Sequence, residues 1–295
     1  MRIERRKITP EASYTSKMNP LISIVIPNHN GVLFVAEAVK SVLEQDYLNK
    51  EVIVVDDGSS DGSIELLRTY GGKIRLIETE NLGASAARNA GILATKGDLI
   101  AFLDSDDIWV ANKLTLQLQI MLDEGADLVY CHGQEFGNQT GLNMKRLAMY
   151  SGDCYPFFKQ NPGKAIIDMG PSTVLLKKNL LSSSGIFDTS FTGLGEDWDF
   201  FRRYCRIAKV DYCDEVLVMR RSHSNNLSNR SLQDFYLGNK RALLKMFAED
   251  LAIGVMERRL IWIKFHIMSA KAFIKYGSIA NGIRCLLQFI LPITL

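Results

Sequence analysis

Short apolar runs alternate with amphipathic stretches along the first third of the chain. Residues 21–27 (LISIVIP) and 51–56 (EVIVVD) are apolar and rich in β-branched side chains, which is the pattern of buried strands. Between them, apolar residues from Leu33 to Leu43 recur at the spacing of an amphipathic helix. Helix, strand, helix and strand are then predicted in turn at residues 63–70, 74–78, 84–95 and 99–104. This order predicts a mostly parallel sheet with helices on both faces.

The pattern becomes less regular beyond Trp109, where a helix is predicted to run to Asp123. Further strands are predicted at 128–131, at 173–176 and within 212–219. Residues 133–170 contain scattered Gly, Asn and Pro, which predicts loops and short irregular elements where a variable acceptor site is expected. Another helix is predicted to begin near Asp197, and only helical patterns follow Ser231.

These elements divide the chain into three predicted parts. They are a flexible lead-in (1–19), an α/β catalytic domain (20–229) and a C-terminal helical region (230–295). The chain has 295 residues, of which 47% are hydrophobic, so it can bury one large core. Its five cysteines are an odd number without C-x-x-C spacing, which argues against a disulfide framework and a structural zinc site. We therefore expect a reducing, cytoplasmic setting.

Polar residues follow directly on three of the predicted strands, at 28–30 (NHN), 56–59 (DDGS) and 104–107 (DSDD). Ligands bind beyond the carboxyl ends of strands in an open α/β sheet, so these residues are candidates for binding. Asp104 and Asp106 flank a single residue, and crowded carboxylates repel one another unless a hard divalent cation neutralises them. Such a cation would stabilise a departing diphosphate. The alternative is that these acidic residues cap the following helix.

Two further positions allow a functional and a structural interpretation. Asp57 could accept a hydrogen bond from a base N–H, whereas the simpler interpretation of DDGSSDGS is a solvated turn. Arg88 lies in NLGASAARNAG, at the start of a predicted helix, where it could reach a phosphate or a carboxylate in the cleft. A surface arginine on a tightly packed helix is the alternative.

Carboxylates around an indole mark a third candidate segment, GEDWD at 195–199. A carboxylate partly walled by an aromatic ring can have a raised pKa and act as a general base, which makes Asp197 and Glu196 candidates. Capping of the helix that follows is the competing interpretation. His223, in RSHSNN, is a candidate metal or phosphate ligand, although a lone histidine is more often structural.

The order and spacing of these segments together resemble glycosyltransferase family 2, whose members have the GT-A fold. The segments that carry the resemblance are SIVIPNHN (23–30), SVLEQDY (41–47), VVDDGSSDGS (54–63), NLGASAARNAGI (81–92), FLDSDDIW (102–109) and GEDWDF (195–200). The resemblance covers about 21–229, with a poor match over 133–170. P-loop, strand-linked G-x-G-x-x-G and H-E-x-x-H motifs are absent from the sequence, so hydrolysis at a P-loop, Rossmann cofactors and zinc peptidase chemistry lose support.

The resemblance implies a role for each matching residue. The nucleotide pocket would be lined by Pro27, Asn28 and Asn30, with Asp57 at the base, usually uracil. Further candidates for nucleotide binding are Arg88, Asp104 and Ser105. Asp104 and Asp106 match the D-x-D motif, in which the last aspartate binds Mn²⁺ or Mg²⁺ with the donor diphosphate. His223 resembles the histidine that approaches the metal or the diphosphate in many members. Asp197 matches the catalytic base, and Glu196 is the nearer alternative. His29 stands where many members carry tyrosine.

The activity implied by the resemblance is inverting transfer of a hexosyl or N-acetylhexosaminyl group. The donor would be a nucleotide-diphosphate sugar, UDP-linked in most members, and the acceptor a hydroxyl of a glycan or lipid-linked molecule in cell-surface polysaccharide synthesis. Two alternatives remain from the residues alone. One is a nucleotide-sugar-binding protein without turnover. The other is a phosphatase-like hydrolase that uses the D-x-D motif, although such a hydrolase is expected to carry this motif after an early strand.

Charge is unevenly distributed along the chain. The net charge is only +2, yet residues 258–295 carry six basic side chains and no acidic one, which leaves the rest of the chain net acidic. The last uncharged stretch, 285–295, is 11 residues long, well short of the roughly 20 residues that span a bilayer. This pattern predicts peripheral contact with the anionic inner face of a membrane rather than nucleic-acid binding. Packing on the catalytic domain, or a homo-oligomer interface, is the alternative.

Overall fold

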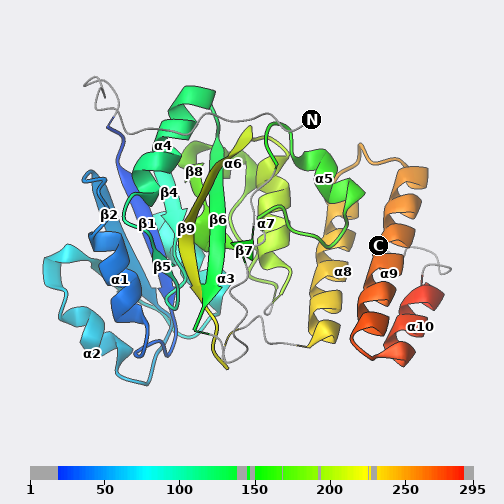
Figure 1. Ribbon diagram of the computed structural model, residues 1–295, viewed down its shortest axis with the longest axis horizontal. Helices are drawn as coiled ribbons and strands as arrows, with labels where there is room; N and C mark the ends of the chain where they lie inside the picture. The colour runs from blue at the N-terminus through cyan, green and yellow to red at the C-terminus, as the bar shows by residue number, and fades with distance from the viewer. Residues whose placement is uncertain are drawn as a thin grey trace.

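The predicted strands lie next to one another in a single sheet (Figure 1). The computed structural model describes residues 19–137, 145–146, 150–167, 169–191, 194–224, 226 and 231–288. Their strands are β1 (Ile22–Asn28), β2 (Lys50–Asp56), β3 (Arg75–Glu78), β4 (Leu99–Phe102), β5 (Ile108–Trp109), β6 (Leu128–Phe136), β7 (Lys145–Arg146), β8 (Leu175–Lys177) and β9 (Val210–Arg221). The order across the sheet is β3-β2-β1-β4-β8-β6-β9-β5, with β7 paired to β6.

The half of the sheet built from the first hundred residues is parallel. Strand β1 pairs with β2 from Ile22 opposite Lys50 to Asn28 opposite Asp56, and also runs parallel to β4. The carboxyl ends of β1, β2 and β4 therefore meet at one edge, as the sequence predicts. Beyond β4 the sheet is mixed, because β8 is antiparallel to both β4 and β6, while β6 and β9 are parallel.

Helices cover both faces of this sheet, which confirms the predicted α/β fold class. The helices are α1 (Val35–Leu43), α2 (Ser63–Arg68), α3 (Ala84–Ala94), α4 (Lys113–Glu124), α5 (Tyr155–Gln160), α6 (Leu181–Ser184), α7 (Glu196–Cys205), α8 (Leu232–Glu249), α9 (Val255–Lys275) and α10 (Ile279–Gln288). Side chains alternate across each strand. Ile24 and Ile26 of β1 pack with α1 and α4, whereas Val25 packs on the opposite side with Ile92 of α3.

Two segments differ from the sequence-based expectation. Residues 108–109 form the short strand β5, and helix α4 begins only at Lys113, because the Trp109 backbone pairs with β9 and its indole donates to the carbonyl of Ser172 at 2.8 Å. The stretch expected to be irregular from residue 133 contains the end of β6 and the helix α5. The predicted domain boundary near residue 229 lies outside the described residues.

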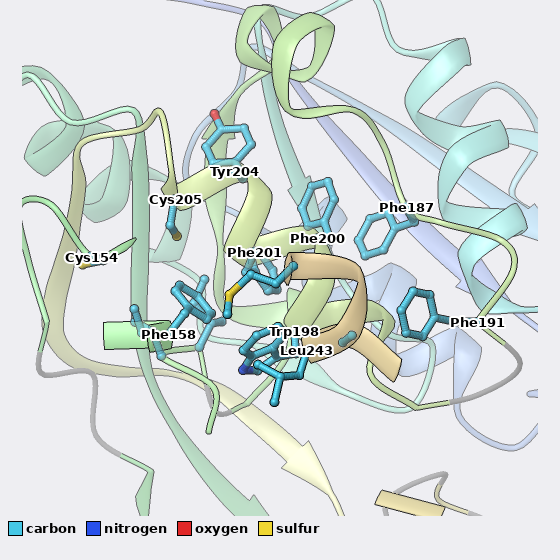
Figure 2. Close-up of a cluster of buried hydrophobic side chains, with 14 of the residues drawn as sticks. Cys154, Phe158, Phe187, Phe191, Trp198, Phe200, Phe201, Tyr204, Cys205 and Leu243 are labelled. Atoms are coloured by element: carbon cyan, nitrogen blue, oxygen red, sulfur yellow. The ribbon is translucent and has the colours of Figure 1, made fainter. Parts of the chain in front are cut away.

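The C-terminal helices share a core with the sheet. One buried cluster contains Val25 of β1, the aromatic residues of α7 and apolar side chains of α8, α9 and α10. Figure 2 shows Trp198, Phe200 and Phe201 of α7 in one cluster with Leu243 of α8. Each such side chain contributes about 1.5–3 kcal/mol when fully buried, so this packing fixes α7 between sheet and C-terminal helices. None of the described helices is long and apolar enough to cross a bilayer.

Helix α7 is also held by buried charges. The carboxylate of Asp199, which is fully buried, accepts hydrogen bonds from Arg202 at 2.7 Å, from Arg203 at 2.9 Å and from Lys245 of α8 at 2.9 Å. Opposite charges and hydrogen bonds together compensate the cost of burying this carboxylate. They hold the pKa of Asp199 below its usual range despite burial. The N-terminus of α7, where the candidate base lies, is therefore anchored from one turn away.

Candidate active site

A cavity of about 390 Å³ opens where β1, β2 and β4 end. Nine residues predicted to bind nucleotide or metal line it, namely Pro27, Asn28, Asn30, Asp57, Arg88, Asp104, Ser105, Asp106 and His223. The parallel register explains this convergence, because the residues that follow each strand emerge at the same edge. The structure thus brings the predicted set into one place.

The loop after β1 is fixed by side-chain bonds to the loop after β2. The Asn28 amide donates to Asp56 at 2.7 Å, and its Oδ1 is buried without a hydrogen-bond partner among the described residues. A Cβ at position 31 would overlap this Oδ1, so only glycine fits there. Asn30 adopts a positive φ of 51°, and its Oδ1 accepts from the backbone N–H of Ser60 at 2.8 Å. Asn28 Oδ1 is therefore a buried acceptor whose hydrogen bond is not made among the described residues, enclosed beside Gly31.

Asp57 shapes the wall of the cavity. Its buried carboxylate accepts from Thr79 Oγ1 at 2.8 Å and from the backbone N–H groups of Leu82 at 2.9 Å and Gly83 at 2.7 Å. These bonds fix the loop that precedes α3, a more specific arrangement than a solvated turn. Each carboxylate oxygen can accept more than one hydrogen bond, so a base N–H can still be accommodated.

The three aspartates of DSDD have different partners. Asp104 Oδ1 accepts from Arg88 at 2.8 Å, and Asp107 is buried, accepting from Ser172 Oγ at 2.7 Å. Asp106 Oδ2 lies 3.0 Å from His223 Nε2 and accepts from the Asn226 amide at 3.0 Å. Burial and the nearby charge of Asp104 raise the pKa of Asp106, and His223 opposes that shift. Helix capping does not explain these contacts, since the cap of α4 is Asn112.

A divalent cation fits the Asp106 end of this motif. Carboxylate and imidazole are ligands that Mn²⁺ accepts, and Mg²⁺ is commonly held by one or two carboxylates together with substrate phosphates. In the part of the chain that the structure describes, no three His, Cys, Asp or Glu side chains form a complete cluster for a metal. Asp106 and His223 would thus supply two ligands to such a cation, and donor phosphate oxygens would supply others.

Asp197 lies beside the cavity with its two carboxylate oxygens in different surroundings. Oδ1 is buried and lies 3.6 Å from Arg88 Nη1, while 35% of the side-chain surface remains exposed. Burial raises the pKa of Asp197 to about 7; the Arg88 charge acts against the shift, and Glu196 and Asp104 add to it. A carboxylate with a pKa near neutrality is suited to accept a proton. Glu196 is more buried, and its Oε2 has no hydrogen-bond partner among the described residues.

Arg88 connects the two acidic groups. Its side chain is only 6% exposed and contacts both Asp104 and Asp197, so the surface interpretation is wrong and the expected contact with a cleft carboxylate is present. The two carboxylates lie against one guanidinium, which places the D-x-D motif and the candidate base in the same site. Arg88 Nε and Nη1 form no hydrogen bond within the described ranges.

Several residues at this site were not singled out from the sequence. Asn226 contacts Asp106, and the backbone N–H of Arg221 donates to Asp107 at 3.2 Å. The Arg221 guanidinium also lies over the rings of Phe34, at 4.8 Å, and Phe136, at 4.6 Å. Arg221 and Asn226 both belong to the segment RRSHSNN (220–226), which begins at the end of β9. The strand-end rule that pointed to His223 applies equally to them.

Comparison with known proteins shows what the chain is similar to. Residues 23–183 match the family model described as Glycosyl transferase family 2. An uncharacterized glycosyltransferase of Rickettsia prowazekii is 32% identical over 243 residues, which cover 77% of this chain and 74% of that protein. The UDP-Glc:alpha-D-GlcNAc-diphosphoundecaprenol beta-1,3-glucosyltransferase WfgD of Escherichia coli is 38% identical over 122 residues, covering 41% of this chain and 48% of that protein.

Solved structures share the fold. S. aureus TarS in complex with UDP-GlcNAc has a TM-score of 0.68 at 19% identity, covering 91% of this chain and 80% of that one. The mannosyltransferase PcManGT from Pyrobaculum calidifontis, in complex with GDP-Man and Mn²⁺, has a TM-score of 0.58 at 16% identity, covering 94% of this chain and 76% of that one. At these identities the likeness extends to the GT-A architecture alone.

Proposed function

Because the chain belongs to glycosyl transferase family 2 and is therefore a glycosyltransferase, we propose that it transfers a sugar from a UDP-sugar to a hydroxyl with inversion at the anomeric carbon. One observation carries the proposal. Arg88 holds the first aspartate of the D-x-D motif and Asp197 together, and Asp197 keeps part of its carboxylate open to solvent. A base and a diphosphate site so close together suit one direct displacement. Family membership also removes the support for a hydrolase.

In the proposed reaction Asp197 accepts the proton of the acceptor hydroxyl. The acceptor oxygen attacks the anomeric carbon, and the bond from that carbon to the donor phosphate oxygen breaks, which releases UDP. A single displacement inverts the configuration, and no covalent glycosyl intermediate forms. Arg88 orients the buried oxygen of Asp197, so the other oxygen faces the acceptor. The raised pKa of Asp197, about 7, makes it a competent base near neutral pH.

The donor pocket is proposed to hold the nucleotide at the ends of β1 and β2. Asn28 and Asp57 line the same wall of the cavity, and a carboxylate oxygen of Asp57 can accept a further hydrogen bond from a base N–H. The relative WfgD is named for a UDP-glucose donor, which supports UDP. A divalent cation, Mn²⁺ or Mg²⁺, would be held by Asp106 and His223, with Asp104 near, and would stabilise negative charge on the departing diphosphate.

The acceptor is proposed to be lipid-linked, at the inner face of a membrane in cell-surface polysaccharide synthesis. WfgD acts, by its name, on a diphosphoundecaprenol-linked sugar. In this chain α9 exposes Leu260 (64%), Ile267 (36%) and Ile274 (48%) along one side. Lys264, Lys271 and Lys275 are exposed at interleaved positions, so this side is both apolar and basic. Such a surface suits peripheral binding to anionic lipid.

Donor binding and turnover of two variants test the proposal. We expect Asp197→Asn to bind UDP like the wild type and to lose transfer by roughly 10²–10⁴-fold, since only the base is removed. Asp106→Ala should instead weaken UDP binding in the presence of Mn²⁺. Calorimetry with UDP, with and without chelator, and release of UDP from a panel of UDP-sugars measure both effects. Equal UDP binding with and without metal, or unchanged turnover by Asp197→Asn, would contradict the scheme.

A further inference from the structure

A second cavity, of about 240 Å³, lies between α8, α9 and the loop of residues 162–164. Its walls are mostly apolar and aromatic, with Phe235 and Tyr236 from α8 and Phe265, Met268 and Phe273 from α9. Figure 1 shows α8, α9 and α10 together at one end of the molecule, beyond α7. The volume is below the roughly 300–1,000 Å³ of sites that enclose a whole small ligand, so this groove suits a short segment of a longer apolar molecule.

The groove adjoins the segment that carries the candidate base. The carbonyl of Lys164, in the groove wall, accepts a hydrogen bond from the indole of Trp198 at 2.9 Å, and Trp198 follows Asp197 in α7. On the other side of the groove, α8 approaches the turn before Asp197. A Cβ built at Gly195 would lie 2.6 Å from the carbonyl oxygen of Gly238. These two contacts place the walls of the groove against α7 and the turn before it, next to Asp197 in the chain.

Cationic side chains flank the apolar walls. Lys264 and Lys271 stand four residues before and three residues after Met268, so they share its side of α9, and both are exposed. Lys164 is exposed at the opposite wall. Residues 258–295 contain no acidic side chain to neutralise them. Apolar walls with a cationic rim complement a hydrocarbon chain that ends in an anionic group.

We propose that this groove binds the first isoprenoid units of a polyprenyl-diphosphate acceptor, with the diphosphate at the lysine rim and the attached sugar directed to Asp197. The inference rests on the proposed lipid-linked acceptor. A polyprenyl diphosphate matches both features of the groove, whereas a free sugar matches neither. The aromatic walls suit the branched, unsaturated chain, and the exposed side of α9 places the groove beside the proposed membrane surface.

Equilibrium binding of farnesyl diphosphate tests the site, with UDP and Mn²⁺ at saturation so that the donor pocket is filled. Ala272→Trp places an indole in the groove, and Ala280→Trp makes the same change at an exposed position of α10. We expect Ala272→Trp to bind farnesyl diphosphate about tenfold more weakly, because the indole would displace about two CH₂ groups of the ligand from the groove. Ala280→Trp should bind it like the wild type. Unaltered UDP binding and melting temperature would show that Ala272→Trp folds.

Several outcomes would overturn the inference. Equal affinity of the two variants for farnesyl diphosphate would do so. Inorganic pyrophosphate that binds the unmodified protein as tightly as farnesyl diphosphate would do so as well. If lysophosphatidylglycerol, which has one acyl chain, binds as tightly as farnesyl diphosphate, the groove is assigned to membrane lipid. If a variant truncated after Gln288 binds farnesyl diphosphate and the full chain does not, the occupant of the groove is the last segment of the chain itself. Failure of the proposed function is distinct, because UDP-sugar turnover would then be absent in every variant, whatever binds in the groove.

Discussion

Asp197 is the residue whose environment matters most for the chemistry. Burial raises its pKa to about 7, and the charge of Glu196 adds to that shift. Because a base must be deprotonated to accept a proton, kcat/KM should rise as pH increases through about 7. Glu196→Gln removes a negative charge, so the pKa of Asp197 falls and the rise moves to lower pH.

Initial rates at subsaturating acceptor, measured from about pH 5 to pH 9, check this shift. Glu44→Gln, at an exposed position directly after α1, is the matched control and should leave the profile in place. A profile that does not move in Glu196→Gln would contradict the assignment of Asp197. Complete loss of activity in Glu196→Gln, with activity kept in Asp197→Asn, would identify Glu196 as the base.

At the residue scale, the sequence predicts positions where the cause is local. Asp104, Asp106 and His223 all follow apolar strands, and the structure brings them to the edge where strands end. The burial of Arg88 could not be predicted, because it depends on Asp197 more than a hundred residues later. Asp57 likewise receives its bonds from another loop. The catalytic and binding roles of these residues stay predictions until measured.

At the scale of elements, the close contact between α8 and the turn before α7 is open to a single test. An added Cβ at Gly238 would overlap the carbonyl of Leu194, so Gly238→Ala must push α8 and this turn apart. Alanine normally stabilises a helix interior by about 0.5–1 kcal/mol relative to glycine. We nevertheless expect Gly238→Ala to lose both stability and turnover, because the turn carries Asp197.

Thermal unfolding and kcat of the purified variant measure the two effects. Gly72→Ala is the matched control, since a Cβ there meets nothing within 4 Å and its φ is not positive. It should behave like the wild type. A Gly238→Ala variant with raised stability and normal kcat would show that the contact between these elements is not needed.

The buried charges between α7 and α8 give a second prediction. Asp199→Asn leaves Arg202, which is fully buried, without its full countercharge. Breaking a buried ion pair in this way typically destabilises a protein by about 3 kcal/mol. Asp188→Asn removes a partly exposed partner of Lys245 and should cost less than about 1 kcal/mol. Urea denaturation of both variants compares the free energies of unfolding, and equal losses would refute the special role of Asp199.

Elements were predicted well where periodicity is strong and poorly where tertiary contacts decide. The alternating runs of the first hundred residues match β1 to β4 and α1 to α3 to within a few residues. Strand β5 has only two residues and forms because β9 lies beside it. No local pattern could indicate it. The antiparallel pairing of β8 is likewise a property of the assembled sheet.

At the scale of the whole molecule, the basic and apolar side of α9 and α10 predicts binding to anionic vesicles. Each basic residue near a charged bilayer contributes about 1 kcal/mol, so Lys275→Gln with Arg284→Gln should weaken binding about thirtyfold. Sedimentation with phosphatidylglycerol vesicles at low salt measures the change. Lys40→Gln with Lys73→Gln, on the far part of the sheet domain, is the control with the same loss of charge. Equal binding by both double variants would contradict a specific membrane surface.

The division of the chain into a catalytic domain and a helical region stays a prediction. A single buried cluster contains residues from β1 to α10. Composition could not reveal that the sheet and the C-terminal helices share this cluster. Only contacts between distant segments show which helices complete a core.

The backbone contact between Gly195 and Gly238 has a consequence for protein engineering. Helix α8 lines the proposed groove at Phe235 and touches the turn before the candidate base at Gly238. A graft of these helices from another transferase would need a small residue at that crossing and the same helical register. Side chains such as Met268 and Ala272 can be exchanged without that constraint, so they are the natural starting library for altering which acceptor the enzyme takes.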